Sequence, residues 1–301
     1  MNVFEVEFWE MGNEELGMRN EKGGMKMKRF IFTLVFLCVL AAGAFGQTAE
    51  DYFNQGNTCA EQGDYNRAIT AYTNAICLSP NFADAYYNRG IAYKASGDNT
   101  RAIADFTQAI RLNPNHANAY NNRGNAYQDN GDNTRAIVDY TEAIRLNPNF
   151  AVAYYNRGFA YYASGDYTRA IADCTEAISL NPNYANAYYN RGVAYQNSGD
   201  NTRAIADYTQ AIRLNPNLSV AYNGRGVAYN ANGDYTRAIV DHTEAIRLNP
   251  NFAIAYNNRG KTYALNGDYT RAIADFEAAL RIDPNYTNAR RALEMARQLA
   301  Q

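Results

Sequence analysis

The sequence has few of the residues that build metal centres, disulfide frameworks and nucleic-acid surfaces. Only two histidines and four cysteines occur in 301 residues, too few for a histidine-rich metal site or a dense disulfide framework. The 28 basic and 30 acidic residues give a net charge of −2, so no basic excess is available to attract a nucleic acid. Glycine-rich phosphate loops, paired catalytic carboxylates and metal-ligand spacings are also missing from the sequence. We therefore expect no metal, no cofactor and no nucleic-acid partner.

The prolines and many of the glycines recur at a fixed interval. The prolines stand 34 residues apart, at Pro80, Pro114, Pro148, Pro182, Pro216, Pro250 and Pro284. Gly-Asp pairs keep the same step, from Gly63-Asp64 to Gly267-Asp268. A fixed period over seven copies is the signature of a solenoid, in which each repeat packs on its neighbours. The sequence therefore predicts one elongated array over 49–286 rather than two globular domains.

Each copy has the pattern of a helix, a turn and a second helix. In 151–184, apolar residues recur every three or four positions in two stretches, as one face of a helix requires. Gly165-Asp166 separates the two stretches and supplies turn chemistry. Pro182 ends the second stretch because proline cannot continue a helix.

Counted from the first residue of each copy, the fourth place is always Tyr, the eighth Gly and the twentieth Ala. This pattern resembles the tetratricopeptide repeat (TPR), and the resemblance covers 238 of the 301 residues. It implies an all-α fold, a right-handed superhelical TPR solenoid of seven helix-turn-helix repeats plus a C-terminal capping helix. We expect the eighth-place Gly to face the twentieth-place Ala, so that the two helices approach closely. The predicted repeats are 49–82, 83–116, 117–150, 151–184, 185–218, 219–252 and 253–286, and the capping helix is 287–301.

Residues 25–46 have the pattern of a secretory signal peptide. A basic cluster of Lys26, Lys28 and Arg29 precedes an uncharged, mostly apolar run over 30–46 that ends in small residues. The run has 17 residues, so an uncleaved membrane anchor is the alternative. We expect an exported protein, periplasmic in a bacterium or secreted, that contacts the membrane only if the signal stays uncleaved and anchors it to the inner membrane.

A signal belongs at the start of a chain, whereas residues 1–24 precede this one and share nothing with the repeats. Met25 and Met27 stand directly before the basic cluster. We interpret one of them as the true start and 1–24 as a mis-called extension. A genuine disordered leader is the alternative.

Two charged columns depart from the TPR pattern, which usually has Leu at the seventh place and an apolar residue near the twenty-third. The last six repeats carry Arg at the seventh place and Asp at the twenty-third, whereas the first repeat has Gln55 and Ala71 there. Joint loss in one repeat predicts an ion pair between the two helices of each repeat, and two independent solvated charges are the alternative. The predicted pairs are Arg89 with Asp105, Arg123 with Asp139, Arg157 with Asp173, Arg191 with Asp207, Arg225 with Asp241, and Arg259 with Asp275.

The sixth place carries a column of asparagines that is interrupted by Gly224. In TPR arrays the first helix of each repeat lines the concave face, so the resemblance places this column there. An amide offers both donors and an acceptor and can hold a peptide backbone, as in the similar asparagine ladder of the protein O-linked N-acetylglucosamine transferases. A structural bridge between neighbouring helices is the alternative. The column consists of Asn54, Asn88, Asn122, Asn156, Asn190 and Asn258.

Aromatic residues flank this column and complete the predicted peptide-binding face. Tyr87, Tyr155 and Tyr189 occupy the fifth place, and Phe159 and Tyr162 lie further along the same helix as Tyr155. Aromatic side chains with a polar tip suit the binding of a peptide. The basic residues that TPR domains use to clamp a chaperone tail are not at the matching places, so such a partner is not expected.

His242 and Cys174 stand at the twenty-fourth place, where other repeats have Tyr or Phe, so we expect both to be buried rather than reactive. The sequence thus predicts a non-enzymatic protein–protein interaction scaffold or adaptor of the cell envelope. Its partner is a peptide or a helix held in the concave groove. A membrane-anchored periplasmic assembly scaffold and a substrate-recognition subunit of an enzyme system are the alternatives.

Overall fold

The computed structural model describes residues 46–301. These residues form fifteen helices and contain no strand. The predicted leader and signal lie outside the described residues, apart from Gly46 at the boundary. The chain divides into two compact units, one up to Pro114 and one from Asn115 onward.

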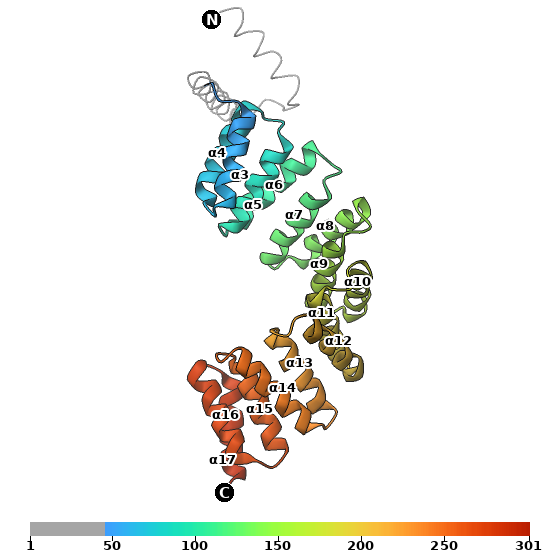
Figure 1. Ribbon diagram of the computed structural model, residues 1–301, viewed down its shortest axis with the longest axis vertical. Helices are drawn as coiled ribbons and strands as arrows, with labels where there is room; N and C mark the ends of the chain where they lie inside the picture. Colours follow the sequence, from blue (N-terminus) through green and yellow to red (C-terminus); the bar gives the residue numbers. More distant parts are fainter. Residues whose placement is uncertain (1–45) are drawn as a thin grey trace, which may run out of the picture. The chain divides into compact units, whose positions relative to one another are not determined.

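The first unit consists of two helical hairpins, each made of a first helix and a second helix (Figure 1). The two first helices contact each other, and the second helix of one hairpin packs on the first helix of the next. The helices are α3 (Ala49–Glu61), α4 (Tyr65–Leu78), α5 (Ala83–Ala95) and α6 (Asn99–Leu112).

The second unit continues the same arrangement with five hairpins and a final single helix (Figure 1). Its first helices are α7 (Ala117–Asp129), α9 (Ala151–Ala163), α11 (Ala185–Asn197), α13 (Ser219–Ala231) and α15 (Ala253–Leu265). Its second helices are α8 (Asn133–Leu146), α10 (Tyr167–Leu180), α12 (Asn201–Leu214), α14 (Tyr235–Leu248) and α16 (Tyr269–Ile282). The final helix is α17 (Thr287–Leu299).

The Gly-Asp pair shapes the turn inside each hairpin. Gly131 has a φ of 79°, a left-handed conformation that glycine adopts without steric cost. Asp132 then caps α8, because its Oδ1 accepts the backbone N–H of Arg135 at 2.9 Å. That backbone hydrogen bond lowers the pKa of Asp132 below its ordinary value. The sequence pair therefore ends one helix and starts the next.

The Asn-Pro-Asn segment shapes the turn between hairpins. Asn147 ends α8, and its backbone N–H still donates to the carbonyl oxygen of Ala143 at 2.9 Å. Its side-chain Oδ1 accepts the backbone N–H of Asn149 at 3.1 Å, while Pro148 prevents the helix from continuing. The chain therefore reverses at the same point in every copy.

A glycine lets the two helices of each hairpin approach, but its neighbour differs from the expected alanine. A Cβ added to Gly124 would lie 2.7 Å from the ring of Tyr140, at the twenty-fourth place. Gly158 faces the smaller Cys174, with 3.1 Å from the added Cβ to Sγ, and the backbone oxygen of Ala170 at 3.2 Å. The twentieth-place Ala is thus a secondary contact, because the bulkier twenty-fourth side chain fills the space above the glycine.

Contacts between hairpins show which side of the second unit is the inner one. Successive first helices contact each other, whereas no second helix of 115–301 contacts another second helix. The first helices therefore lie on the inner side of the stack. Places three, eight and ten of these helices are buried in the hairpin, as Ala119, Gly124 and Ala126 are. We call the side chains at places two, five, six, nine, twelve and thirteen of α7, α9, α11, α13, α15 and α17 the inner face.

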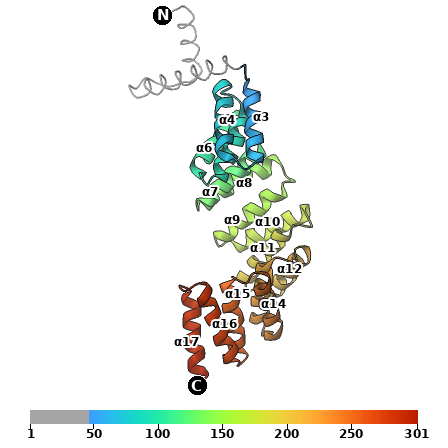
Figure 2. The ribbon, with the colours of Figure 1, turned by 60° about the vertical axis from the view of Figure 1, so that its left-hand side comes forward.

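The final helix covers the last hairpin. Leu293 and Ala296 of α17 are buried against Phe276 of α16, and Figure 2 shows these two helices side by side. Arg297 forms an ion pair of 2.8 Å with Glu277 at the edge of this contact. Residues 287–299 therefore cover the apolar surface that the last hairpin would otherwise expose.

Substitution of Gly124 tests the close approach of the two helices. We expect Gly124→Ala to lower the free energy of unfolding by about 2 kcal/mol, because the new methyl group collides with the Tyr140 ring. The collision outweighs the gain of about 1 kcal/mol in helix propensity. Urea unfolding followed by circular dichroism measures the change. Gly158→Ala is the matched control, and an equal loss there would show that the ring contact is not the cause.

Candidate protein-binding face

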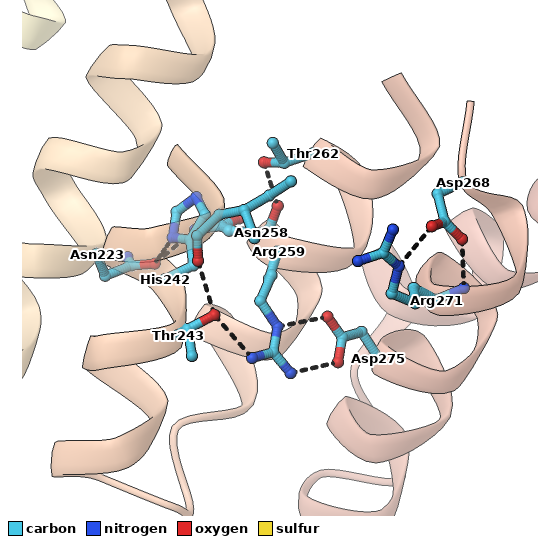
Figure 3. A network of polar contacts seen from close by, with 10 residues as sticks. Asn223, His242, Thr243, Asn258, Arg259, Thr262, Asp268, Arg271 and Asp275 are labelled. Atoms are coloured by element: carbon cyan, nitrogen blue, oxygen red, sulfur yellow. Dashed lines mark hydrogen bonds and ion pairs between the residues drawn. The ribbon is translucent and has the colours of Figure 1, made fainter. Parts of the chain in front are cut away.

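A buried arginine joins the two helices of each of the last six repeats. In 151–184, Arg157 donates from Nε to Oδ2 of Asp173 and from Nη2 to Oδ1, both at 2.8 Å. The same two-bond pair forms in each repeat that carries both residues, at 2.7 to 2.8 Å. The sequence predicts this pairing within a repeat, because the first repeat lacks both the arginine and the aspartate. Figure 3 shows it for Arg259 and Asp275.

The same guanidinium also reaches the preceding repeat. Arg157 donates from Nη1 to Oγ1 of Thr141 at 3.0 Å, and Arg259 does the same to Thr243 (Figure 3). Sequence reasoning missed this bond, although threonine recurs at the twenty-fifth place of the first six copies. The bond explains why the first repeat has no arginine, since α3 has no earlier hairpin of 46–301 to bind.

A tyrosine ring lies beside each of these arginines, and five of the six have two such rings. Cζ of Arg157 lies 5.7 Å from the ring centre of Tyr154 and 5.9 Å from that of Tyr161. Tyr161 also carries the exposed Arg169 at 4.4 Å on its other side. The fourth-place and eleventh-place tyrosines therefore contact cations as well as the apolar core. The hydrogen bond to Asp173 raises the pKa of Arg157 above its ordinary value.

The Arg–Asp pair can be tested by removing one partner or both. We expect Arg157→Leu alone to cost about 3 kcal/mol, because it leaves the buried Asp173 charge unpaired. Arg157→Leu with Asp173→Tyr restores the apolar and aromatic pattern and should be neutral or stabilising. Urea unfolding measures both variants.

The exposed pair of Arg145 and Glu142 is the control for this experiment. Arg145→Leu should cost much less than Arg157→Leu, because surface pairs contribute little. Equal costs for the single and double changes at Arg157 would refute the pairing.

Three asparagines of the sixth place bridge neighbouring first helices. Asn156 donates both Nδ2 hydrogens, to Oδ1 of Asn121 and to Oδ1 of Asn125, each at 3.0 Å. Asn258 donates to Asn223 Oδ1 at 3.1 Å, and in the first unit Asn88 donates to Asn57 Oδ1 at 2.9 Å. These amides connect neighbouring hairpins. For these three residues the structure therefore shows the bridge between helices that was the alternative to peptide binding. Asn156 is left with only its carbonyl oxygen for a ligand.

The other members of the column differ. Asn54 is exposed on α3, and Oδ1 of Asn122 accepts a long bond of 3.4 Å from Asn121. Nδ2 of Asn190 is buried without a hydrogen-bond partner within 46–301. Gly224 interrupts the column, and an added Cβ there would lie 2.8 Å from the Tyr208 ring.

The predicted aromatic residues fall into two groups. Tyr87, Tyr155 and Tyr189 are half-buried and pack against rings of neighbouring elements, with Tyr155 centred 4.9 Å from Tyr184. Burial raises the pKa of Tyr155 and of Tyr189. Phe159 is different, because 42% of it is exposed on the inner face, 6.5 Å from the Tyr162 ring. The structure therefore brings Phe159 and Tyr162 together at the surface.

The inner face exposes further apolar side chains that sequence reasoning missed. Val152 and Ile254 stand at the second place of α9 and α15, and 42% and 49% of them are exposed. Apolar residues recur at that place only in the fourth, sixth and seventh copies. This recurrence in the sequence could have indicated the exposed apolar side chains. Val152 and Phe159 are seven residues apart and share one side of α9.

His242 is fully buried at the base of the inner face, and Cys174 is buried at the same place two repeats earlier. Burial raises the pKa of the Cys174 thiol to about 12. Nδ1 of His242 lies 3.1 Å from Oδ1 of Asn223, which also accepts from Asn258 (Figure 3). Nε2 has no partner within 46–301. Desolvation, with the nearby Arg259 charge, lowers the pKa of His242 to about 4.

This burial predicts a loss of stability in mild acid. Unfolded His242 titrates near 6.5 and folded His242 near 4, so the unfolded chain binds more protons between those values. The contribution of neutral His242 to the free energy of unfolding is complete above pH 6.5 and falls as the pH drops toward 4. We expect about 2 kcal/mol to be lost between about pH 7.5 and about pH 5. His242→Phe should remove that part of the loss in urea unfolding, whereas His116→Asn should leave it unchanged.

Other features of the described chain do not form a reactive site. No group of three or more His, Cys, Asp or Glu side chains in 46–301 is placed to hold a metal ion. An open cavity of about 700 Å³ lies among turns of the second unit, beside Asp200 and Arg203 and away from the inner face. No helix within 46–301 has the length and apolar character needed to cross a membrane.

Comparison with known protein families identifies the family of this chain. Profiles described as TPR repeat match 56–97, 92–131, 124–165 and 226–267. Profiles described as tetratricopeptide repeat match 151–184, 185–218, 253–286 and 207–240. These matches span most of the chain, so the protein belongs to the tetratricopeptide-repeat family. Members of this family generally bind protein or peptide partners and generally lack enzymatic activity.

Solved structures of TPR proteins share the fold. A tetratricopeptide repeat protein from Parabacteroides merdae is 22% identical with a TM-score of 0.65, over 82% of this chain and 98% of that one. MamA is 29% identical with a TM-score of 0.52, over 57% of this chain and 93% of that one. YrrB, described as a TPR protein with an unusual peptide-binding site, is 25% identical with a TM-score of 0.53, over 63% and 97%. No curated protein matches the chain.

Proposed function

We propose that the chain is a non-enzymatic scaffold or adaptor that holds a protein partner against the inner face of 115–301. One observation carries the proposal: Val152 and Phe159 are each 42% exposed on the same side of α9. Contiguous exposed apolar patches mark interaction sites, and Val152 and Phe159 lie on one side of a single helix. The likeness to YrrB, whose structure is described as having a peptide-binding site, supports this role.

The partner fits as an extended peptide or a helix laid across the first helices. Phe159 and Tyr162 provide apolar contact, and the free carbonyl oxygen of Asn156 can accept a backbone N–H. The asparagine column therefore offers a peptide fewer hydrogen-bond donors than its residue type implies. Several of its amide groups already donate hydrogen bonds to the neighbouring hairpin.

We also propose that the protein is exported to the cell envelope. The basic cluster and apolar run of 25–46 support this proposal. Mass spectrometry of the purified protein tests it, since cleavage leaves Gln47 or Phe45 as the first residue. If the apolar run over 30–46 is retained, the result favours a membrane-anchored assembly scaffold instead. The other alternative, a substrate-recognition subunit of an enzyme system, requires that an enzyme co-purifies with the protein.

Site-specific crosslinking tests the inner face. We expect a photoreactive phenylalanine in place of Phe159 to form an adduct with a partner protein in living cells. The same residue in place of Val138 should form none, because Val138 is 64% exposed on the second helix α8. Gel mobility and mass spectrometry of the adducts measure the outcome. Equal adducts at both positions would contradict binding at the inner face.

A further inference from the structure

Charge is distributed unevenly along the inner face of the second unit. The inner faces of α9, α11 and α13 contain no charged residue. Asp129 of α7 is at one end, and Lys261 of α15 and Arg291 of α17 are at the other. These three are the only charged residues at the inner-face places of 115–301.

The two cations differ from the other basic residues of the array. Arg259, two residues before Lys261, is held by Asp275 and Thr243. Lys261 and Arg291 are both exposed, and neither forms an ion pair within 46–301. Their charges are therefore available to a partner.

Exposed aliphatic side chains continue from each cation along its helix. Leu265 follows Lys261 by four residues on α15 and is 60% exposed. Met295 and Leu299 follow Arg291 by four and eight residues on α17, and 61% and 62% of them are exposed. Residues four apart share one side of a helix, and α15 contacts α17. Two neighbouring helices thus present a cation followed by aliphatic side chains; Figure 2 shows both helices.

The places of α17 that correspond to contacts inside a hairpin carry charge. In the repeats, the fourth, eighth and eleventh places of a first helix face its own hairpin, as Tyr, Gly and Tyr. In α17 these places hold Arg290, Glu294 and Arg297, which are exposed and charged. A further hairpin or a second copy stacked end to end would bury those charges. Arg291 and Met295 stand at the fifth and ninth places, which in α7 are Asn121 and Asn125, the residues that contact the next first helix.

We propose that the inner face at α15 and α17 binds an extended segment of a protein partner in which an acidic side chain stands next to apolar residues. The acid lies against Lys261 and Arg291, and the apolar residues cover Leu265, Met295 and Leu299. Two cations beside aliphatic side chains are too few for a nucleic acid or an anionic membrane, which are recognised by larger basic clusters. This inference rests on the proposed function and specifies its partner.

Selection from random linear peptides displayed on phage, with the full chain as bait, supplies the probe. We expect the selected peptides to carry Asp or Glu beside apolar residues. The strongest peptide and its acid-to-amide form are then compared by fluorescence anisotropy. The acidic form should bind about tenfold more tightly, as expected for one interfacial ion pair.

The variant Lys261→Gln with Arg291→Gln should abolish that preference. Its control is Arg213→Gln with Arg281→Gln, which removes the same charge from the second helices α12 and α16 and should keep the preference. Leu265→Ser with Met295→Ser should weaken both peptide forms. Unfolding midpoints confirm that each variant is folded.

Four results would overturn the inference. A preference that survives Lys261→Gln with Arg291→Gln refutes it while leaving binding at the inner face intact. Loss of binding when the peptide's carboxyl terminus is amidated identifies a terminal carboxylate instead of an internal acid. Equal binding to phosphatidylglycerol vesicles, lost in the same variant, identifies a lipid site. Selection of no peptide by the wild type refutes this inference together with a peptide-binding role.

Discussion

The fold depends on a buried arginine that binds in two directions. Arg157 pairs with Asp173 across its own hairpin and donates to Thr141 in the preceding one. A buried ion pair contributes little net stability, but a misplaced hairpin would leave both charges unpaired. The guanidinium therefore selects a single register for each hairpin on the one before it. Repetition of this bond gives α9, α11, α13 and α15 the same orientation on the hairpin before each.

That constant orientation creates the inner face. Places three, eight and ten are buried in the hairpin, and places four, seven and eleven form the cluster of tyrosine and arginine. The remaining places vary more, although some of them, such as those of Tyr155 and Asn156, make contacts between neighbouring elements. Aromatic, amide, aliphatic and charged residues therefore follow one another along this face, from Asp129 to Arg291, without any change in the backbone.

The asparagines show how one residue type serves two purposes. Asn156 and Asn258 extend the connection between hairpins, because their amides bind asparagines of the preceding first helix. Gly224 interrupts this connection, and a Cβ added to it would lie 2.8 Å from the Tyr208 ring. The sequence pattern alone could not separate a ligand-binding amide from a bridging one, since both need the same chemistry on the same side of a helix.

The repeat length, both turns and the Arg–Asp pair could be predicted from the sequence, because each depends on residues within one copy and recurs at a fixed step. Contacts between copies became visible only in the three-dimensional structure. It showed the bond from Arg157 to Thr141, the tyrosine rings around the guanidinium and the ring of Tyr140 above Gly124. It also showed which side chains, such as Val152 and Met295, stay exposed. These features arise from packing between helices that are far apart in the sequence, and no local pattern records such distances.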